Sequence, residues 1–190
     1  MARSKRASEA SSTYGLLFCT VVLLLASIVM QARNSALLDA FIPKMASSTK
    51  PYATFEQFYP HYLREHSQQT TRQWHYFGTT LVVLYLLSHP VLLLPILAGG
   101  LSAYASMPFF RNLSTGVFEI VILMVIYLIG GKLLTGSLKK TFAPLLLGYG
   151  FAWVGHFYFE HNKPATFVYP TFSLLGDFRM LFDAVRQLRF

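Results

Sequence analysis

The chain of 190 residues contains a single cysteine, Cys19, and few charged residues. One cysteine cannot form a disulfide within the chain, and it excludes a zinc site built from several thiolates. Charged residues make up 13% of the sequence and hydrophobic residues 54%, whereas soluble proteins carry about 25% charged residues. Because the apolar residues are concentrated in blocks, this composition indicates membrane segments rather than a large soluble core.

Acidic residues are also scarce: eight Asp and Glu stand against 16 Lys and Arg, for a formal net charge of +8. Basic residues lie near the ends of the apolar blocks, namely Arg3, Lys5, Arg6, Lys132, Lys139, Lys140, Arg179, Arg186 and Arg189. This distribution fits anionic lipid headgroups and the control of membrane topology. No nucleic-acid-binding module is recognisable. We therefore expect membrane lipid, and no nucleic acid, among the partners.

Residues 1–50 form an N-terminal extension in which Tyr14–Met30 is apolar and follows a basic, Ser/Ala-rich start. This segment, residues 14–30, fits a signal anchor, a cleaved signal peptide or part of an organellar targeting sequence. Its apolar region is long for a cleavable signal, and no clear small-x-small cleavage site follows. An uncleaved anchor is therefore the favoured interpretation.

Residues 51–190 are predicted to form one membrane domain made of helices. The expected segments are an aromatic amphipathic helix at Thr54–His66, apolar spans at Gly78–Tyr104, Gly116–Ile129 and Ala143–Phe159, and an amphipathic interfacial helix at Ser173–Phe190. The Ser88-His89-Pro90 group divides the first span into a kinked helix or, preferably, two short helices. The fold class that follows is all-α: a multi-pass membrane helical bundle with interfacial amphipathic helices.

Five of the six histidines lie in two short polar islands at the margins of apolar blocks, residues 59–75 and 155–164. An unpaired imidazole is costly in an apolar setting, and imidazole is the commonest metal ligand. His66, His75 and His156 can converge at one membrane face if the spans between them return to the same side. The plainer interpretation is that these histidines only satisfy hydrogen bonds at the bilayer interface.

Glu160 lies four residues after His156, so both side chains point from one face of a helix, as two ligands of one metal ion would. His161 follows immediately. The alternative for this pair is a capped helix end with a hydrogen-bonded histidine. His61 and His89 are weaker candidates, expected to face headgroups and a surface turn respectively.

Imidazole with carboxylate and no thiolate suits Fe(II), Zn or Mn, and such sites with open positions are typical of non-haem Fe(II) oxygenases. A haem held by two histidines would need them in the middle of the membrane. The dense histidine boxes of membrane di-iron enzymes are missing. A mononuclear Fe(II) site is therefore the preferred hypothesis.

Four strings in the sequence resemble the 2-hydroxy fatty-acid dioxygenase family. They are FYPHYLREH at 58–66, RQWHYFGT at 72–79, GYGFAWVGHFYFEHNKPATF at 148–167 and YPTFSLLGDFRM at 169–180. The resemblance spans residues 55 to about 185. It implies a small multi-pass protein of the endoplasmic reticulum membrane with Fe(II)-dependent dioxygenase activity. That activity shortens a 2-hydroxy acyl chain by one carbon with O2, during α-oxidation in phytosphingosine breakdown, without 2-oxoglutarate.

The resemblance also assigns residues. His66, His75 and His156 match the histidines of the family pattern, with Glu160 beside the last, whereas relatives can carry lysine at the position of His161. A basic group is expected to hold the substrate carboxylate, and the candidates are Arg64, Arg72, Lys163 and Arg179. The N-terminal extension lies outside the resemblance, so another organellar membrane is the alternative localisation.

Two other functions fit the same residues. A non-enzymatic membrane scaffold or lipid-binding subunit would use the histidines only for interfacial hydrogen bonds. A lipid hydrolase would use zinc to activate water. The identity of the metal separates these hypotheses: iron, none or zinc.

Overall fold

The computed structural model describes residues 49–187, and within them the chain forms helices joined by turns, with no strand. The helices are α3 (Phe55–Arg64), α4 (Gln69–Ser88), α5 (Leu93–Ser106), α6 (Val117–Thr135), α7 (Leu138–Val154) and α8 (Pro170–Gln187). The predicted all-α class is thus confirmed. The predicted anchor at residues 14–30 lies outside the described residues.

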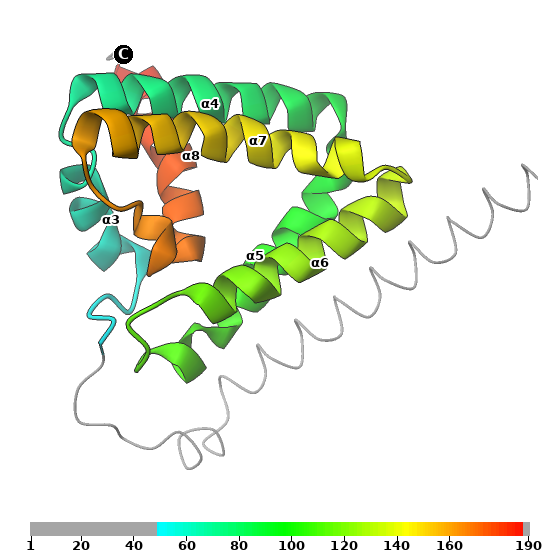
Figure 1. Cartoon of the computed structure of the whole chain (residues 1–190), viewed down its shortest axis with the longest axis horizontal. Coiled ribbons are helices and arrows are strands. Elements are labelled where there is room, and N and C mark those ends of the chain that lie inside the picture. The colour runs from blue at the N-terminus through cyan, green and yellow to red at the C-terminus, as the bar shows by residue number, and fades with distance from the viewer. Residues whose placement is uncertain (1–48, 188–190) are drawn as a thin grey trace, which may run out of the picture.

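Two helix pairs form a wedge, with α4 packed against α7 and α5 packed against α6 (Figure 1). The pairs meet where α4 turns into α5 and α6 turns into α7, and they diverge toward the end that holds α3 and α8 (Figure 1). The first of these turns is a short 3-10 segment, Pro90–Leu92. The predicted break at the Ser88-His89-Pro90 group is confirmed, because α4 ends at Ser88. The second turn uses Gly136 at φ 69, a backbone conformation that glycine adopts without strain.

The antiparallel register of α4 and α7 places the start of α4 beside the end of α7. Gly78 lies so close to α7 that an added Cβ would meet the Phe151 Cβ at 2.8 Å and the Leu147 carbonyl oxygen at 3.1 Å. Farther along the pair, the Tyr85 hydroxyl donates to the Lys140 carbonyl at 3.0 Å. This register brings the two polar islands of the sequence together at the open end of the wedge.

Helices α3 and α8 pack their aromatic side chains against each other at that open end. Phe58 and Tyr62 of α3 are 0% exposed, and Phe172 of α8 is 1% exposed. The sequence predicted that α3 contributes an aromatic belt at a membrane interface; instead, these rings form part of a protein core. An amphipathic pattern gives the same signal whether lipid or another helix covers the apolar face.

A buried ion pair joins the start of the described chain to α6. Lys50 Nζ donates to Glu119 Oε1, and both side chains are 1% exposed. The sequence places Lys50 in the N-terminal extension, yet its side chain packs inside the folded unit. Removing two charges from water is costly unless they are paired, so the pair fixes residue 50 against the first turn of α6.

Two helical segments of the described chain have the length and hydropathy of a membrane span. Pro90–Phe110 has a mean hydropathy of 1.6 and Val117–Thr135 one of 2.3. They include the α5/α6 pair of Figure 1. Neither α4 nor α7, whose apolar parts were predicted to cross the bilayer, meets the same criteria. The multi-pass arrangement therefore stays a prediction for those two helices.

Candidate metal centre

Three histidines from three separate segments meet at the open end of the wedge. His66 follows α3, His75 lies in α4, and His156 lies in the π-helical turn Gly155–Glu160 that ends α7. One ligand atom from each comes within 4.8 Å of the others, and the ring centroids are 4.4 to 5.0 Å apart. All three side chains are buried. Within the described chain, this is the group of His, Cys, Asp and Glu whose geometry could hold a metal ion.

Each imidazole has an oxygen acceptor at its Nδ1 atom. His66 Nδ1 lies 2.7 Å from the Tyr62 carbonyl oxygen, one turn back on α3. His75 Nδ1 lies 2.6 Å from Asp177 Oδ1, and His156 Nδ1 lies 2.7 Å from Asn162 Oδ1. A carbonyl, a carboxylate or an amide oxygen can only accept, so each Nδ1 carries the proton and donates it. The Nε2 atom of each ring therefore keeps its lone pair.

The Nε2 atoms of His66 and His75 are buried, and neither has a hydrogen-bond partner among the described residues. A buried polar atom without a partner costs about 1–3 kcal/mol, which a bound cation would offset. Burial and the nearby His75 and His156 lower the pKa of His66 to about 3, and burial also lowers the pKa of His156. Both rings are then neutral at physiological pH, the form in which imidazole binds metal.

Asp177 is a functional residue that the sequence reasoning missed. Its Oδ1 accepts hydrogen bonds from His75 Nδ1 at 2.6 Å and from the Tyr62 hydroxyl at 2.7 Å. Burial alone would raise the pKa of Asp177, but the electrostatic interaction with His75 and the hydrogen bonds from His75 and Tyr62 outweigh it, so the pKa is lowered. The carboxylate therefore stays ionised and fixes the His75 ring, as carboxylates behind metal-binding histidines do.

Asn162 has the same role for His156 and was also missed. The π turn ends at His161, whose backbone is left-handed at φ 55, and the next residue folds back under the His156 ring. The Asn162 Nδ2 group donates to the Glu65 carbonyl at 2.8 Å. One amide side chain thus connects the two polar islands and orients an imidazole.

Glu160 and His161, offered by the sequence as metal ligands, lie outside the three-histidine group. The Glu160 carboxylate accepts from the Gln68 backbone N–H at 2.6 Å and from the Ser67 hydroxyl at 3.0 Å. It therefore caps the N-terminus of α4, where the helix dipole favours negative charge. His61 is half-buried and stacks on Tyr52, with ring centroids 5.2 Å apart.

The four basic residues proposed to hold a substrate carboxylate are not brought to the cluster's cavity. Arg64, Lys163 and Arg179 are exposed, and Arg179 pairs with Asp183 on its own helix at 3.0 Å. Arg72 Nε donates to the His66 carbonyl at 2.6 Å, so it supports the backbone of a cluster residue instead.

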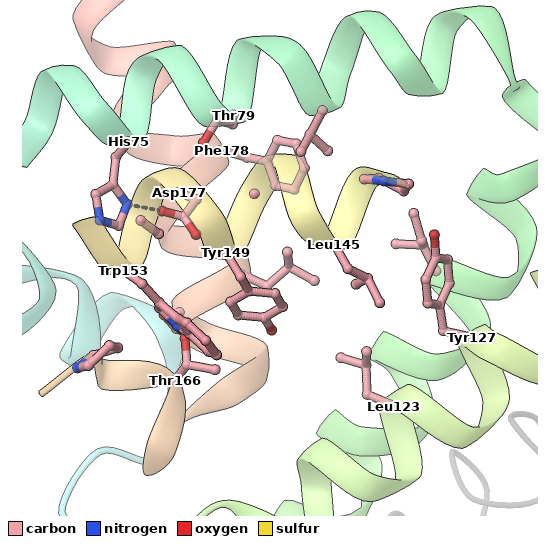
Figure 2. Close-up of a pocket in the computed structure, with 18 of the residues that line it drawn as sticks. His75, Thr79, Leu123, Tyr127, Leu145, Tyr149, Trp153, Thr166, Asp177 and Phe178 are labelled. Carbon is pink, nitrogen blue, oxygen red and sulfur yellow. Dashed lines mark hydrogen bonds and ion pairs between the residues drawn. The ribbon is translucent and has the colours of Figure 1, made fainter. Parts of the chain in front are cut away.

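A cavity extends from the cluster between the two helix pairs (Figure 2). Its polar end is lined by His75, His156, Thr166, Ser173 and Asp177. Its other end is lined by Val82, Leu86, Ile96, Leu123, Tyr127 and Leu145. Figure 2 shows His75 and Asp177 at one side of the view and Leu123 and Tyr127 at the other. The cavity thus suits a molecule with a polar head and a long apolar tail.

Three imidazoles with no thiolate fit a divalent transition metal such as iron or zinc, and they leave coordination positions for other ligands. The carboxylate of the site lies behind a histidine, at Asp177, rather than beside the metal position at Glu160. The arrangement can therefore hold a metal ion at the polar end of an apolar cavity.

Comparison with protein families gives a match over most of the chain. The model of a family described as 2-hydroxy-palmitic acid dioxygenase Mpo1-like matches residues 52–188. This range contains the three histidines and their partners Asp177 and Asn162. Comparisons with curated proteins and with solved structures give no match.

Proposed function

The chain belongs to the 2-hydroxy-palmitic acid dioxygenase Mpo1-like family, and from this membership we propose that it is an Fe(II)-dependent dioxygenase that shortens 2-hydroxy fatty acids by one carbon. One observation carries the proposal: the cluster of His66, His75 and His156 lies at the polar end of an otherwise apolar cavity. The reaction is that of α-oxidation, as in the breakdown of phytosphingosine.

The described residues fit an iron ion. The orphaned Nε2 atoms of His66 and His75 are buried lone pairs, and the partner at each Nδ1 fixes the tautomer that exposes them. Bound Fe(II) would supply the site at which O2 is activated and would carry electrons to it from the substrate.

The overall reaction balances with O2 as the second substrate: R–CH(OH)–COOH + O2 gives R–COOH + CO2 + H2O. The bond between C1 and C2 breaks, C1 leaves as CO2, and C2 becomes the new carboxyl carbon. Four electrons leave the substrate and reduce O2. The substrate thus replaces 2-oxoglutarate as the electron donor.

The residues of the chain bind and orient the substrate. The hydroxyl groups of Thr166 and Ser173 lie 2.9 Å apart at the polar end of the cavity. One of them donates to the other, so the second keeps its proton to donate to a carboxylate or a 2-hydroxyl group. The apolar walls hold the acyl tail, and each methylene group removed from water contributes about 0.8 kcal/mol. The same walls exclude water from the reacting atoms.

The proposed location is the endoplasmic reticulum membrane, with the alternative that residues 1–50 direct the protein to another organelle. One observation supports a membrane setting, namely the apolar helices Pro90–Phe110 and Val117–Thr135; the proposed substrate would itself partition into lipid. Imaging of the full-length protein and of a variant lacking residues 1–48, which keeps Lys50 and its partner Glu119, tests both alternatives.

The activity is tested by loading the full chain with Fe(II) under anaerobic conditions and then adding 2-hydroxypalmitate and O2. Mass spectrometry should detect a fatty acid one carbon shorter, with O2 consumed in equal amount. The His156→Ala variant should give no product. Iron-loaded, folded wild-type protein that leaves 2-hydroxy acids of every chain length unchanged would refute the proposal.

A further inference from the structure

We infer that the apolar end of the cavity, at Leu123, Tyr127 and Leu145, sets the acyl chain length that the protein accepts. This inference rests on the proposed function for the identity of the substrate. The three residues come from α6 and α7, and Figure 2 shows Leu123 and Tyr127 on the side of the cavity opposite His75. They specify how far an acyl tail can extend from the reacting atoms.

The length of the cavity follows from the two helices along its sides. On α4, the lining runs from His75 to Leu86, and on the antiparallel α7 side it runs from His156 to Leu145. The two ends of each stretch are eleven positions apart, so each stretch spans about 16 Å at the rise of a helix. The hydrocarbon core of a bilayer is about 30 Å thick, so acyl chains of one leaflet reach about 15 Å. The length of the cavity thus matches one membrane acyl chain, whereas its volume of about 100 Å³ means that side chains along its walls must move apart when a tail enters.

The end wall is held firmly in place. An added Cβ at Gly99 would meet the Leu123 carbonyl oxygen at 2.8 Å, so α5 and α6 are in backbone contact there. The Tyr127 hydroxyl donates to the Thr141 carbonyl at 2.6 Å, and the residue is 1% exposed. Because α5 and α7 both contact this wall, a longer tail could displace its side chains only by disturbing close packing.

A second cavity of about 640 Å³ offers an alternative path for the tail. It lies between α3, α4, α5 and α8, and it shares Leu86, Ile96, Leu174 and Phe178 with the first cavity. It is broad and its lining contains no histidine. A tail that entered it would have to pass between the shared residues, whereas the first cavity runs directly from His75 and His156.

Two glycines provide a matched test, one in each cavity. Gly148 lines the first cavity, and an added Cβ there would lie 3.4 Å from Val82 Cγ2, an ordinary contact. Gly100 lines the second cavity, and an added Cβ there meets no atom within 4 Å. A leucine at either position therefore fills one cavity without a backbone clash.

The experiment measures kcat/KM of the iron-loaded full chain for 2-hydroxy acids that differ by two carbons. Gly148→Leu places a side chain about 12 Å from His156 along the helix, so the preferred substrate should become shorter. Gly100→Leu should leave the preference unchanged. Each two-carbon step beyond the new limit should cost about tenfold in kcat/KM, since two methylene groups lose their burial. Leu145→Phe is a second filling variant should Gly148→Leu fail to fold.

Enlarging the end wall should have the opposite effect. Leu123→Ala should raise the preferred length by about two carbons, the space that removal of the isobutyl group opens. Val121→Ala, on the exposed face of the same helix at 51% exposure, should change nothing. A shift caused by Gly100→Leu but not by Gly148→Leu would overturn the inference in favour of the second cavity.

A binding measurement separates this inference from the proposed function. Saturated fatty acids without the 2-hydroxyl group cannot react but should displace a fluorescent fatty acid with the same dependence on chain length. If wild-type protein shows that dependence, and Gly148→Leu lowers the chain length that binds best, the inference about chain length holds even when no 2-hydroxy acid is converted. If wild-type protein converts 2-hydroxy acids but neither Gly148→Leu nor Leu123→Ala shifts the preferred length, the inference about chain length is refuted and the proposed activity holds. If nothing binds and nothing is converted, both fail.

Discussion

His75 donates its Nδ1 proton to Asp177 Oδ1 across 2.6 Å, although 102 residues separate them in the sequence. The contact connects α4 to α8 and turns the Nε2 atom of His75 toward His66 and His156. Asp177 also accepts from the hydroxyl of Tyr62, which lies on α3, the helix that His66 follows. One carboxylate on α8 therefore connects side chains from two other helices, α3 and α4, beside the candidate metal position.

Replacing Asp177 should weaken metal binding without removing a ligand. Asp177→Asn takes away the negative charge that stabilises the His75 N–H donor, and loss of such a partner typically costs about 10–100-fold in metal affinity. Anaerobic Fe(II) titration by calorimetry measures the change. Asp183→Asn on the same helix is the control, since Asp183 bonds Tyr59 and Arg179 rather than a histidine. Equal affinities for the two variants would contradict this role.

Substitutions can show which side chains bind the metal and which only surround it. His66→Ala, His75→Ala and His156→Ala should each lose bound iron, because two remaining imidazoles hold the ion far less tightly. Glu160→Gln should keep its iron and lose only about 1 kcal/mol of stability, the usual worth of a charge or cap at a helix N-terminus. Elemental analysis after desalting gives iron per chain. Loss of iron from Glu160→Gln would restore that carboxylate as a ligand.

Asn162 should matter through the orientation of His156. Asn162→Ala removes the acceptor at Nδ1, so the ring can rotate or change tautomer, and iron affinity should fall by about tenfold. The neighbouring His161→Asn substitution keeps a residue that tolerates the left-handed backbone and should leave affinity unchanged. The same titration distinguishes them, and an unaffected Asn162→Ala variant would exclude the proposed role.

The Lys50–Glu119 pair should stabilise the fold only as a pair. Lys50→Met leaves the Glu119 carboxylate buried without its cation, which typically costs about 3–5 kcal/mol. Adding Glu119→Leu in the same chain should recover most of that loss, because two apolar side chains replace both charges. Thermal unfolding in detergent micelles measures both variants. A double variant no more stable than Lys50→Met would show that the pair is not the cause.

Much of the fold could be predicted from the sequence, because apolar blocks and the Ser88-His89-Pro90 group indicate where helices run and break. Whether lipid or another helix covers an apolar face could not be predicted from the sequence. The sequence predicted that Phe58 and Tyr62 face the membrane interface. In the structure α8 covers them, and α8 itself buries Met180 and Gly176. Hydrophobic periodicity specifies a face and leaves its partner open.

The histidines of the candidate site could be predicted from the sequence, whereas the residues that accept their hydrogen bonds could not. His66, His75 and His156 were selected because imidazoles at apolar margins need a partner, and the structure places them together; their role as ligands stays a prediction. A signal for Asp177 existed: on α8 it lies four residues after the buried Ser173 and three before the buried Met180, so a carboxylate occupies an otherwise buried face. Glu160 was chosen instead because spacing along one helix cannot reveal that α4 begins beside it.

X-ray absorption spectroscopy of the Fe(II)-loaded full chain tests the central claim most directly, since it reports the number of imidazole ligands on the iron. The account predicts three imidazoles in the wild-type protein and in Glu160→Gln, and a changed or absent iron signal in His156→Ala. A spectrum with fewer than three imidazoles, or protein that takes up no iron while folded, would contradict it.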